Sequence, residues 1–289
     1  MILLRKEVKF MEHYSLLGYP LRHTMSPPIH KRLFELAGEY EYEYLIHEIP
    51  PEELEDRIPE LMNLDGFNIT IPHKISIIKY LDELDPSAER YNSVNCVSYK
   101  NGIHIGYNTD CDGFLRALAA EDVKLGGKVL QCGCGGVGRM IAIEAVRNGA
   151  ALTLSLLPGF EDTADPVKKY AEDNGIDADI KIVHPDEISG SFDILINASP
   201  VGMFPKTDAC PVSEDVIANC GFVFDVIYNP EVTKLMKTAQ EHGIKTAGGM
   251  AMLVWQAVVA HEYWNGSVYD PKDIADLISE MHLLMKESF

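Results

Sequence analysis

The sequence predicts an α/β fold of two domains, and three observations carry this prediction. Short apolar segments typical of strands alternate with segments whose apolar residues recur at helical spacing. The chain changes character at residues 124–127, after which strands and helices follow in βαβ order, which favours a parallel sheet. Finally, 289 residues are enough for two domains of ordinary size.

Strand and helix candidates alternate through the first half of the chain. Strands are expected over residues 14–18, 41–47, 66–71, 94–98 and 103–106, and helices over 27–37, 51–62 and 111–120. Ser26 is a candidate N-cap of the first helix, because Pro27 would then stand at the first helical position. The turn Lys100-Asn101-Gly102 contains an Asn-Gly pair, a strong hairpin signal that should join the last two strands.

A glycine-rich turn is the clearest feature of the second half. Strands are expected over residues 128–131, 151–157, 180–183, 193–197 and 222–227, and helices over 139–148, 251–260 and 273–285. The first of these strands is joined to the first helix by Gly133, Gly135, Gly136, Val137 and Gly138. Glycine lets a backbone approach a pyrophosphate closely, and the N–H groups and dipole at a helix start favour its charge. The strand–turn–helix context therefore favours a Rossmann-like dinucleotide site over a merely structural turn.

Composition and charge limit the classes of protein that fit. The formal net charge is −19 and no basic footprint for nucleic acid is present, so an anionic ligand would need a local cluster of donors. No apolar run approaches the roughly 20 residues that span a bilayer, and the N-terminus lacks a secretory pattern, so a cytoplasmic protein is expected. The six cysteines include no CxxC pair, which argues against a metal site and for reduced thiols.

The strand over residues 151–157 bears on the choice of dinucleotide. In a Rossmann-like domain an acidic residue at the end of this strand favours the free ribose of NAD, whereas an arginine favours the 2′-phosphate of NADP. This sequence has Leu156 and Leu157 there, and neither charge. Glu161 and Asp162 follow, and they either reach a ribose hydroxyl or start the next helix. The residues leave NAD and NADP both open.

Three polar stretches of the first half, at residues 23–27, 68–74 and 108–110, stand where strand ends or loops would expose them. Each has a structural alternative. Thr24 and Ser26 could cap a helix, and Asp110 could be an N-cap. Lys74 could be a solvated lysine at a helix start, although a cation there opposes the helix dipole. Taken singly, each stretch is explained by its structural alternative.

Together these stretches resemble the shikimate/quinate dehydrogenase family over nearly the whole chain. The family motifs GxPxxHSxSPxxHN, NxTxPxK, GAVNT and NTDxxG are similar to residues 18–31, 68–74, 92–96 and 108–113. The motifs GAGGxxR, NATxxGM, DxxYxPxxTxLL and GxxMLxxQA are similar to residues 133–139, 197–203, 225–236 and 249–257. Eight motifs in one order are far more specific than any one of them.

The resemblance implies a division of labour along the chain. It implies a substrate-binding domain over residues 1–112, a Rossmann-like NAD(P)-binding domain over 113–249, and C-terminal helices over 250–289 that return to the substrate domain. The implied activity is the NAD(P)-dependent oxidation of shikimate to 3-dehydroshikimate in chorismate and aromatic amino acid biosynthesis. The expected partner is a small-molecule substrate, shikimate or quinate, bound by a monomer or a homodimer.

The resemblance also implies roles for single residues. Lys74 would be the acid/base and Asp110 would orient it, which fits because a lysine amine can accept the hydroxyl proton while nicotinamide takes the hydride. Thr24 and Ser26 would hold the substrate carboxylate. The ring hydroxyls would be held by Thr70, Asn95, Asp110 and Gln256, with Tyr228 nearby. The cofactor would contact Gly133, Gly135, Gly136, Val137, Gly138, Ala198 and Gly249.

The chain departs from the family pattern in three stretches. Thr24 replaces a serine, and its methyl group narrows the carboxylate end of the substrate site. Asn92, Ser93 and Cys96 replace residues of GAVNT. The Asn-Arg pair that binds the 2′-phosphate of NADP in the family is absent near Leu156. Two alternatives follow, a cyclohexane-polyol dehydrogenase that uses NAD and a nucleotide-binding homologue without useful turnover.

Overall fold

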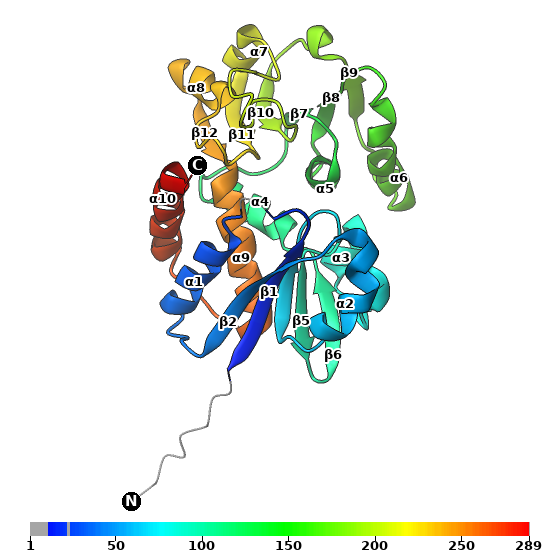
Figure 1. Ribbon diagram of the computed structural model, residues 1–289. Helices are drawn as coiled ribbons and strands as arrows, with labels where there is room; N and C mark the ends of the chain where they lie inside the picture. The colour runs from blue at the N-terminus through cyan, green and yellow to red at the C-terminus, as the bar shows by residue number, and fades with distance from the viewer. Residues whose placement is uncertain (1–10, 22–23, 289) are drawn as a thin grey trace, which may run out of the picture. The chain divides into compact units, whose positions relative to one another are not determined.

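The computed structural model describes residues 11–21 and 24–288, which fold into two compact units (Figure 1). The first unit consists of the described residues up to Thr109 together with Ala257–Leu277. The second consists of Asp110–Gln256 and the described residues from Ile278 onward. Each unit is built on a six-stranded sheet, and the α/β fold class predicted from the sequence is confirmed. Residues 22 and 23, which belong to the first family motif, lie outside the described residues.

The sheet of the first unit is mixed. Its strands are β1 (Glu12–Gly18), β2 (Tyr42–Glu48), β3 (Gly66–Ile69), β4 (Glu83–Leu84), β5 (Cys96–Lys100) and β6 (Ile103–Tyr107), in the order β2-β1-β3-β5-β6-β4. β1 pairs in parallel with β2 and β3, whereas β5 runs antiparallel to β3 and β6. The predicted hairpin is confirmed, because Asn101 and Gly102 join β5 to β6 with φ values of 53° and 89°, the positive values that a tight hairpin turn needs.

The helices of the first unit correct one prediction. They are α1 (Ser26–Leu36), α2 (Leu54–Leu61) and α3 (Pro86–Tyr91), with short 3₁₀ turns at Pro51–Glu53 and Ile78–Tyr80. The prediction that Ser26 caps α1 is wrong, because Met25 holds the N-cap position and Ser26 is the first helical residue. The N–H of Ser26 donates to Thr24 Oγ1 (3.2 Å), so the hydroxyl of Thr24 satisfies a donor at the helix start.

Two apolar clusters form the core of the first unit. One joins β1, β3 and α2 through Leu17, Phe67 and Leu61, which are fully buried. The other is aromatic and includes Tyr14 of β1 and Trp264 of α9 (Gly249–Asn265), whose rings stack with centroids 4.6 Å apart. A residue near the C-terminal end of the chain therefore completes a core that begins at the first described strand.

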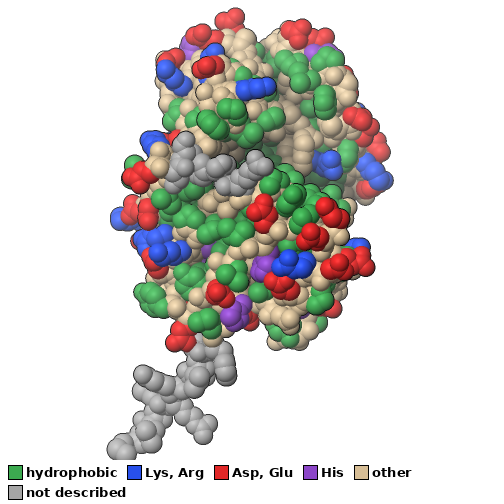
Figure 2. All heavy atoms as spheres, viewed as in Figure 1, with side chains coloured by type: hydrophobic (Ala, Val, Ile, Leu, Met, Phe, Trp, Pro, Cys, Tyr) green, Lys and Arg blue, Asp and Glu red, His purple; other side chains and the backbone are tan. Residues whose placement is uncertain are grey.

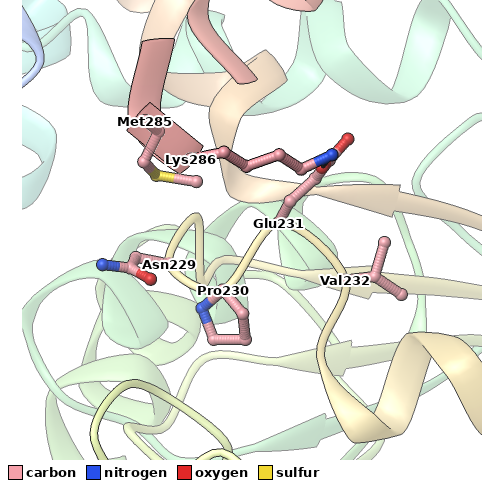
Figure 3. Close-up of a pocket in the computed structure, with 6 residues that line it drawn as sticks. All are labelled: Asn229, Pro230, Glu231, Val232, Met285 and Lys286. Atoms are coloured by element: carbon pink, nitrogen blue, oxygen red, sulfur yellow. Dashed lines mark ion pairs between the residues drawn. The ribbon is translucent and has the colours of Figure 1, made fainter. Parts of the chain in front are cut away.

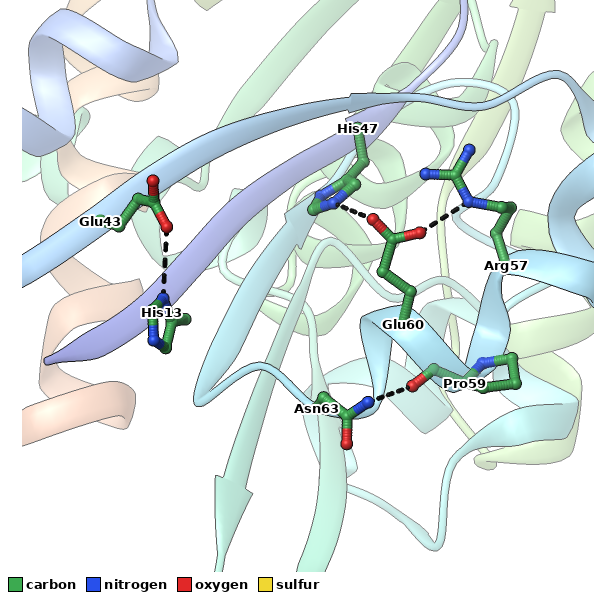
Figure 4. Close-up of polar contacts among 7 residues, drawn as sticks. All are labelled: His13, Glu43, His47, Arg57, Pro59, Glu60 and Asn63. Carbon is green, nitrogen blue, oxygen red and sulfur yellow. Dashed lines mark hydrogen bonds and ion pairs between the residues drawn. The ribbon is translucent and has the colours of Figure 1, made fainter.

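A polar contact attaches α2 to the edge strand β2 (Figure 4). Glu60 accepts a hydrogen bond from Arg57 Nε (2.6 Å), and its other carboxylate oxygen lies 3.0 Å from His47 Nε2. The His47 side chain is 8% exposed, so Glu60 supplies a partner for a nearly buried ring nitrogen. Figure 4 also shows a contact between the neighbouring strands β1 and β2, where Glu43 Oε2 lies 3.3 Å from His13 Nδ1.

The sheet of the second unit is parallel throughout, as the βαβ order predicted. Its strands are β7 (Lys128–Cys132), β8 (Ala151–Ser155), β9 (Ile180–Val183), β10 (Phe192–Asn197), β11 (Cys220–Asp225) and β12 (Lys245–Gly248), in the order β12-β11-β10-β7-β8-β9. The chain moves outward from β7 to β9 and then restarts on the other side of β7 with β10. In such sheets a ligand binds at the carboxyl ends of the strands beside this reversal.

The helices of the second unit follow its strands. They are α4 (Asp110–Ala119), α5 (Gly136–Arg147), α6 (Asp165–Asp173), α7 (Glu214–Ala218) and α8 (Lys234–Glu241), with 3₁₀ turns at Glu161–Ala164 and Pro185–Glu187. α5 begins at Gly136 and not at the predicted residue 139, because the second half of the glycine turn is already helical. α9 and α10 (Pro271–Ser288) each begin in one unit and end in the other.

The surface agrees with the strongly negative composition. Acidic side chains lie at many places on the face seen in Figure 2, and basic side chains are scattered among them. Within the described residues, no helix is long and apolar enough to cross a bilayer, and no group of side chains could hold a metal ion. All six cysteines are free thiols, and burial raises the pKa of Cys134 to about 11 and also raises the pKa of Cys132, so neither is a reactive thiolate.

Candidate active site

Thr70, Lys74 and Asn95 come together beyond the carboxyl end of β3. The N–H of Thr70 donates to the carbonyl of Leu17 at the end of β1 (2.8 Å). The carbonyl of Lys74 accepts a hydrogen bond from the N–H of Val94 (2.8 Å), the residue before Asn95. Two stretches that are separate in the sequence, one with the predicted catalytic lysine and one with a predicted substrate-binding amide, are therefore tied to each other.

The side chain of Asn95 fixes the residue that precedes Asp110. Asn95 is 3% exposed, its Nδ2 donates to Thr109 Oγ1 (3.0 Å), and its Oδ1 accepts from the N–H of Thr109 (2.7 Å). Asp110 follows as the first residue of α4, where its carboxylate complements the helix dipole. Asp110 opens the second unit and Lys74 belongs to the first, so the pairing of these two side chains stays a prediction.

Tyr44 and Asn68, for which the sequence predicted no role, lie near Ser26. The hydroxyl of Tyr44 donates to Asn68 Oδ1 (3.0 Å). Burial raises the pKa of Tyr44, and a hydrogen bond with the side chain of Ser26 acts against that rise. Asn68 is 4% exposed and its Nδ2 has no partner in the described part of the chain, which leaves a buried donor close to the predicted carboxylate site. An amide within the apolar strand β3 was the available signal for Asn68, and no pattern marked Tyr44.

Gln256 lies where α4 and α9 pack closely. Its side chain is 7% exposed, and its Nε2 donates to the carbonyl of Leu253 (2.9 Å). A Cβ atom on Gly113 would lie 2.7 Å from the carbonyl oxygen of Met252 and 2.9 Å from the Cβ of Gln256, so only glycine permits this approach. The glycine of the NTDxxG-like stretch thus brings the helix that starts at Asp110 against the helix that carries Gln256.

Asp225, at the end of β11, organises the loop that carries Tyr228. Its carboxylate is fully buried and accepts hydrogen bonds from Thr233 Oγ1 (2.7 Å), the N–H of Ile227 (3.1 Å) and Asn197 Nδ2 (3.1 Å). Burial raises the pKa of Asp225 to about 6, against the effect of these hydrogen bonds. Burial also raises the pKa of Tyr228. Three residues from the family-like stretches therefore hold the base of the Tyr228 loop.

The glycine turn after β7 leaves room for a diphosphate at the start of α5. A Cβ atom on Gly135 or Gly136 would meet no atom within 4 Å. Gly133 has a φ of 85°, and a Cβ atom on Gly138 would lie 2.7 Å from the carbonyl oxygen of Gly133. The backbone itself requires glycine at these two positions. Val137 lies in the first turn of α5, where free N–H groups and the helix dipole favour a phosphate. The residues present fit a dinucleotide.

Gln131 holds the glycine turn in shape, although it belongs to none of the motifs found in the sequence. Its fully buried Nε2 donates to the carbonyls of Gly133 and Gly138, at 2.8 Å each. Ala198, which follows β10, donates its N–H to the carbonyl of Cys132 (2.9 Å) and therefore lies beside the turn, where a cofactor contact was predicted. A polar residue within the apolar strand β7 was the signal that could have found Gln131.

Close packing explains why position 249 is a glycine. A Cβ atom on it would lie 2.0 Å from the carbonyl oxygen of Val226, and its N–H donates to the carbonyl of Ile227 (3.1 Å). Any larger residue would displace either the start of α9 or the loop after β11. This packing explains the glycine without a cofactor, and the cofactor contact of Gly249 stays a prediction.

The loop after β8 presents a carboxylate and lacks a basic residue. No lysine or arginine occurs over residues 148–167. Leu157 is 58% exposed. Glu161 folds back so that its Oε2 accepts a hydrogen bond from the N–H of Gly159 (2.8 Å), while its Oε1 lies 3.7 Å from His184 Nε2. Glu161 also begins a 3₁₀ turn, so it both starts a helical segment and places a carboxylate near the end of β8.

Comparison with known proteins identifies the family. Residues 16–97 match the family described as shikimate dehydrogenase substrate binding domain. The chain is 37% identical to a shikimate dehydrogenase (NADP(+)) of Caldanaerobacter subterraneus subsp. tengcongensis over 262 residues, which cover 89% of this chain and 92% of that relative. It is similar in structure to shikimate 5-dehydrogenase from Listeria monocytogenes in complex with shikimate and NAD, with a TM-score of 0.83 and 30% identity over 93% of this chain and 96% of that one.

A third similarity is to the ligand-free 5-ketofructose reductase of a Gluconobacter species, with a TM-score of 0.80 and 29% identity over 95% of this chain and 100% of that one. These relatives are enzymes whose similarity covers 89–95% of this chain and is not confined to the glycine turn. The chain therefore belongs to the shikimate dehydrogenase family of oxidoreductases.

Proposed function

We propose that this chain catalyses the reversible oxidation of shikimate to 3-dehydroshikimate with a nicotinamide cofactor, a reaction of aromatic amino acid biosynthesis. The observation that carries the proposal is membership of the shikimate dehydrogenase family, with Lys74 and Asp110 present at the positions of its catalytic pair. We assign substrate binding to residues 1–112 and to the C-terminal helices over 250–289. We assign cofactor binding to residues 113–249, which include the glycine turn.

The reaction requires the substrate hydroxyl to lose a proton and its carbon to lose a hydride, which the bound nicotinamide accepts. Lys74 Nζ takes the proton during oxidation and returns it during reduction, and Asp110 orients the amine. Thr24 and Ser26 donate their hydroxyls to the substrate carboxylate. Asn95, held rigidly against the residue before Asp110, orients a ring hydroxyl at little entropic cost. Further contacts to the ring are assigned to Thr70, Gln256 and Tyr228.

The assignment of Lys74 predicts a specific loss of catalysis. Lys74→Ala should lower kcat for shikimate oxidation by roughly 100-fold or more, the usual contribution of a positioned acid/base. Calorimetric binding of the dinucleotide and the thermal unfolding midpoint should stay unchanged. Lys79→Ala is the matched control, because Lys79 lies nearby in the sequence with its side chain 64% exposed. Full activity of Lys74→Ala would show that another group carries the proton.

We further propose that the chain binds NAD in preference to NADP. The support is the loop after β8, where Glu161 is held in place by Gly159 and His184 and no basic residue is present. A carboxylate there can accept a hydrogen bond from a ribose hydroxyl, whereas it would repel a 2′-phosphate. The relative from Listeria monocytogenes was solved with NAD, while the relative from Caldanaerobacter is named for NADP(+), so the family alone does not decide.

Calorimetric titration with NAD⁺ and NADP⁺ tests this preference. NAD⁺ should bind more tightly to the wild-type chain, and Glu161→Gln should weaken NAD⁺ binding. Leu157→Arg should strengthen NADP⁺ binding selectively, because it supplies a cation at an exposed position of the loop just after β8. Tighter binding of NADP⁺ to the wild type would contradict the proposal. If that binding is then lost in Arg139→Met, the 2′-phosphate belongs to Arg139, whose Nε is buried without a partner in the described residues.

A second candidate is a dehydrogenase of another hydroxylated compound. Two observations favour it, the threonine at position 24 and the similarity to 5-ketofructose reductase. Steady-state rates with shikimate, quinate and 5-ketofructose, each with NAD and NADP, separate the candidates. The highest kcat/KM for quinate or for the ketose would replace shikimate as the substrate. Dinucleotide binding with no turnover of any of them would show a binding protein.

A further inference from the structure

The loop over residues 226–233, which follows β11 and carries Tyr228, is attached at both ends and in its middle. Its ends are held by Asp225, as described above. The carbonyl of Ile227 accepts the N–H of Gly249 (3.1 Å), and the carbonyl of Asn229 accepts the N–H of Phe204 (3.1 Å). The backbone on either side of Tyr228 is therefore fixed by neighbouring segments of the second unit.

Beyond Asn229, the loop is attached to α10 through charged side chains. Lys286 Nζ lies 2.6 Å from Glu231 Oε2, and His282 Nδ1 lies 3.8 Å from Glu231 Oε1. Figure 3 shows Lys286 reaching from α10 to Glu231, with Met285 projecting from the same helix. Glu231 is 28% exposed and Lys286 is 60% exposed, so the carboxylate is partly shielded while the ammonium group lies at the surface.

Packing provides only part of this attachment, although Met285 of α10 is 3% exposed. A cavity of about 350 Å³ separates the loop from the end of α10. Its lining residues are Asn229, Pro230, Glu231, Val232, Met285 and Lys286 (Figure 3). Val232 is 44% exposed and so contributes little packing of its own. Because apolar contact across the cavity is incomplete, the Glu231–Lys286 pair is a polar contact that helps to hold this part of the loop against α10.

The hydroxyl of Tyr228 is available to a ligand. In the described part of the chain no hydrogen bond involves this hydroxyl, although the ring is buried enough to raise the pKa of the phenol. A loop whose backbone is held on both sides of an unpaired phenol presents that phenol in one direction. We infer that Glu231 and Lys286 are positioning residues for Tyr228 in substrate binding. This inference rests on the proposed function, which assigns Tyr228 to the substrate.

Steady-state kinetics with shikimate test the inference. Lys286→Met and Glu231→Gln should each raise KM by roughly five-fold, the upper end for one partly exposed ion pair, with kcat within about two-fold of wild type. The two substitutions combined should raise KM no more than either alone. Tyr228→Phe should also raise KM, and adding Lys286→Met to it should have no further effect, because the pair acts through Tyr228.

The control is another ion pair on the same helix. Lys272 Nζ lies 3.1 Å from Asp276 Oδ2 near the start of α10, and Lys272→Met should leave KM unchanged. Unchanged KM in both Lys286→Met and Glu231→Gln would overturn the inference, as would effects that add to that of Tyr228→Phe. Absence of shikimate turnover in the wild-type chain would instead refute the proposed function, so the two failures are distinguishable. Thermal unfolding confirms that each variant is folded.

Discussion

Asp225 is a buried carboxylate that supports the loop carrying Tyr228 without belonging to the candidate site itself. It ends β11, accepts three hydrogen bonds and ties β10 to the start of α8 through Asn197 and Thr233. Burial of a carboxylate disfavours its charged form, and here that effect exceeds the help from its donors, so the pKa is raised to about 6. The loop that carries Tyr228 is therefore built on a group that is costly to ionise at neutral pH.

This cost predicts a pH-dependent difference between Asp225→Asn and the wild type. The folded-state pKa is about 6 and the unfolded value 3.8, so the folded chain binds the proton more tightly. Its contribution to the free energy of unfolding is complete below about pH 3.8 and is lost as the pH rises through 6, by about 3 kcal/mol in total. Part of this loss has already occurred at pH 4.5, so relative to wild type Asp225→Asn should become more stable by about 2 kcal/mol between pH 4.5 and 7.5.

Urea unfolding at a series of pH values measures this difference. Asp215→Asn, in the exposed first turn of α7, is the control and should follow the wild type. A difference between Asp225→Asn and wild type that does not change with pH would mean that Asp225 ionises as readily in the folded chain as in the unfolded one.

At the residue scale, the sequence indicated which residues have the required chemistry, but it did not indicate which groups their side chains would contact. Gly133 and Gly138 were predictable because a glycine turn between a strand and a helix has a known physical use. The bonds from Gln131 to both carbonyls were not, since a polar residue in a buried strand does not reveal which group it will satisfy. Tyr44 was missed for the same reason, because nothing in an alternating strand indicates that its hydroxyl meets Asn68.

At the scale of elements, local signals were reliable where the backbone demanded a particular residue. The β5–β6 hairpin follows from Asn101 and Gly102, which tolerate positive φ. α3 was not predicted, because six residues are too few for a helical period to be read. Its C-cap, Asn92, has a φ of 47° in the left-handed region, which asparagine tolerates better than most residues. This explains how asparagine can replace the glycine of the GAVNT motif.

The parallel sheet of the second unit was predictable in kind but not in order. The βαβ sequence implies parallel strands, yet nothing local specifies that β10 returns to the far side of β7. Short elements such as α7 and β12 carry too little pattern to be recognised. Capping signals also misplaced the start of α1, because Ser26 is its first helical residue and the hydroxyl of Thr24, two residues earlier, accepts the N–H of Ser26.

At the scale of the whole molecule, the first unit contains a buried pair of histidines from distant parts of the chain. His30 Nδ1 and His261 Nε2 are 3.0 Å apart, and His261 Nδ1 is hydrogen-bonded to the hydroxyl of Tyr269 (2.8 Å). Burial lowers the pKa of His30 to about 3, and burial together with the neighbouring His30 lowers the pKa of His261. Folding therefore requires both rings to be neutral, and the fold of this unit is sensitive to acid.

The predicted consequence is a steep loss of stability below neutral pH. Because the folded pKa of His30 lies below the unfolded value of 6.5, its contribution is complete above pH 6.5 and is lost as the pH falls toward 3. His30 alone should remove roughly 2 kcal/mol of the free energy of unfolding between pH 6.5 and 4.5. Hydrogen exchange at each pH should show the loss in the first unit.

His30→Phe keeps a ring to stack on Tyr44 and should flatten this pH dependence. His13→Gln is the control, because the His13 side chain is 46% exposed in the same unit. Equal slopes of unfolding free energy against pH in His30→Phe and wild type would rule out the buried pair as the acid-sensitive element.

The interleaving of the two units along the chain also affects how the protein folds during its synthesis on the ribosome. Synthesis is vectorial, and domains generally fold as their residues emerge. β12, the last strand of the second sheet, ends at Gly248, whereas Trp264, which stacks on Tyr14 in the aromatic core, emerges later. All strands of the second sheet have therefore been synthesised before the C-terminal helical residues of the first unit, although the strands of the first unit are synthesised earlier. A nascent chain stalled before residue 257 would leave that aromatic core open to chaperones.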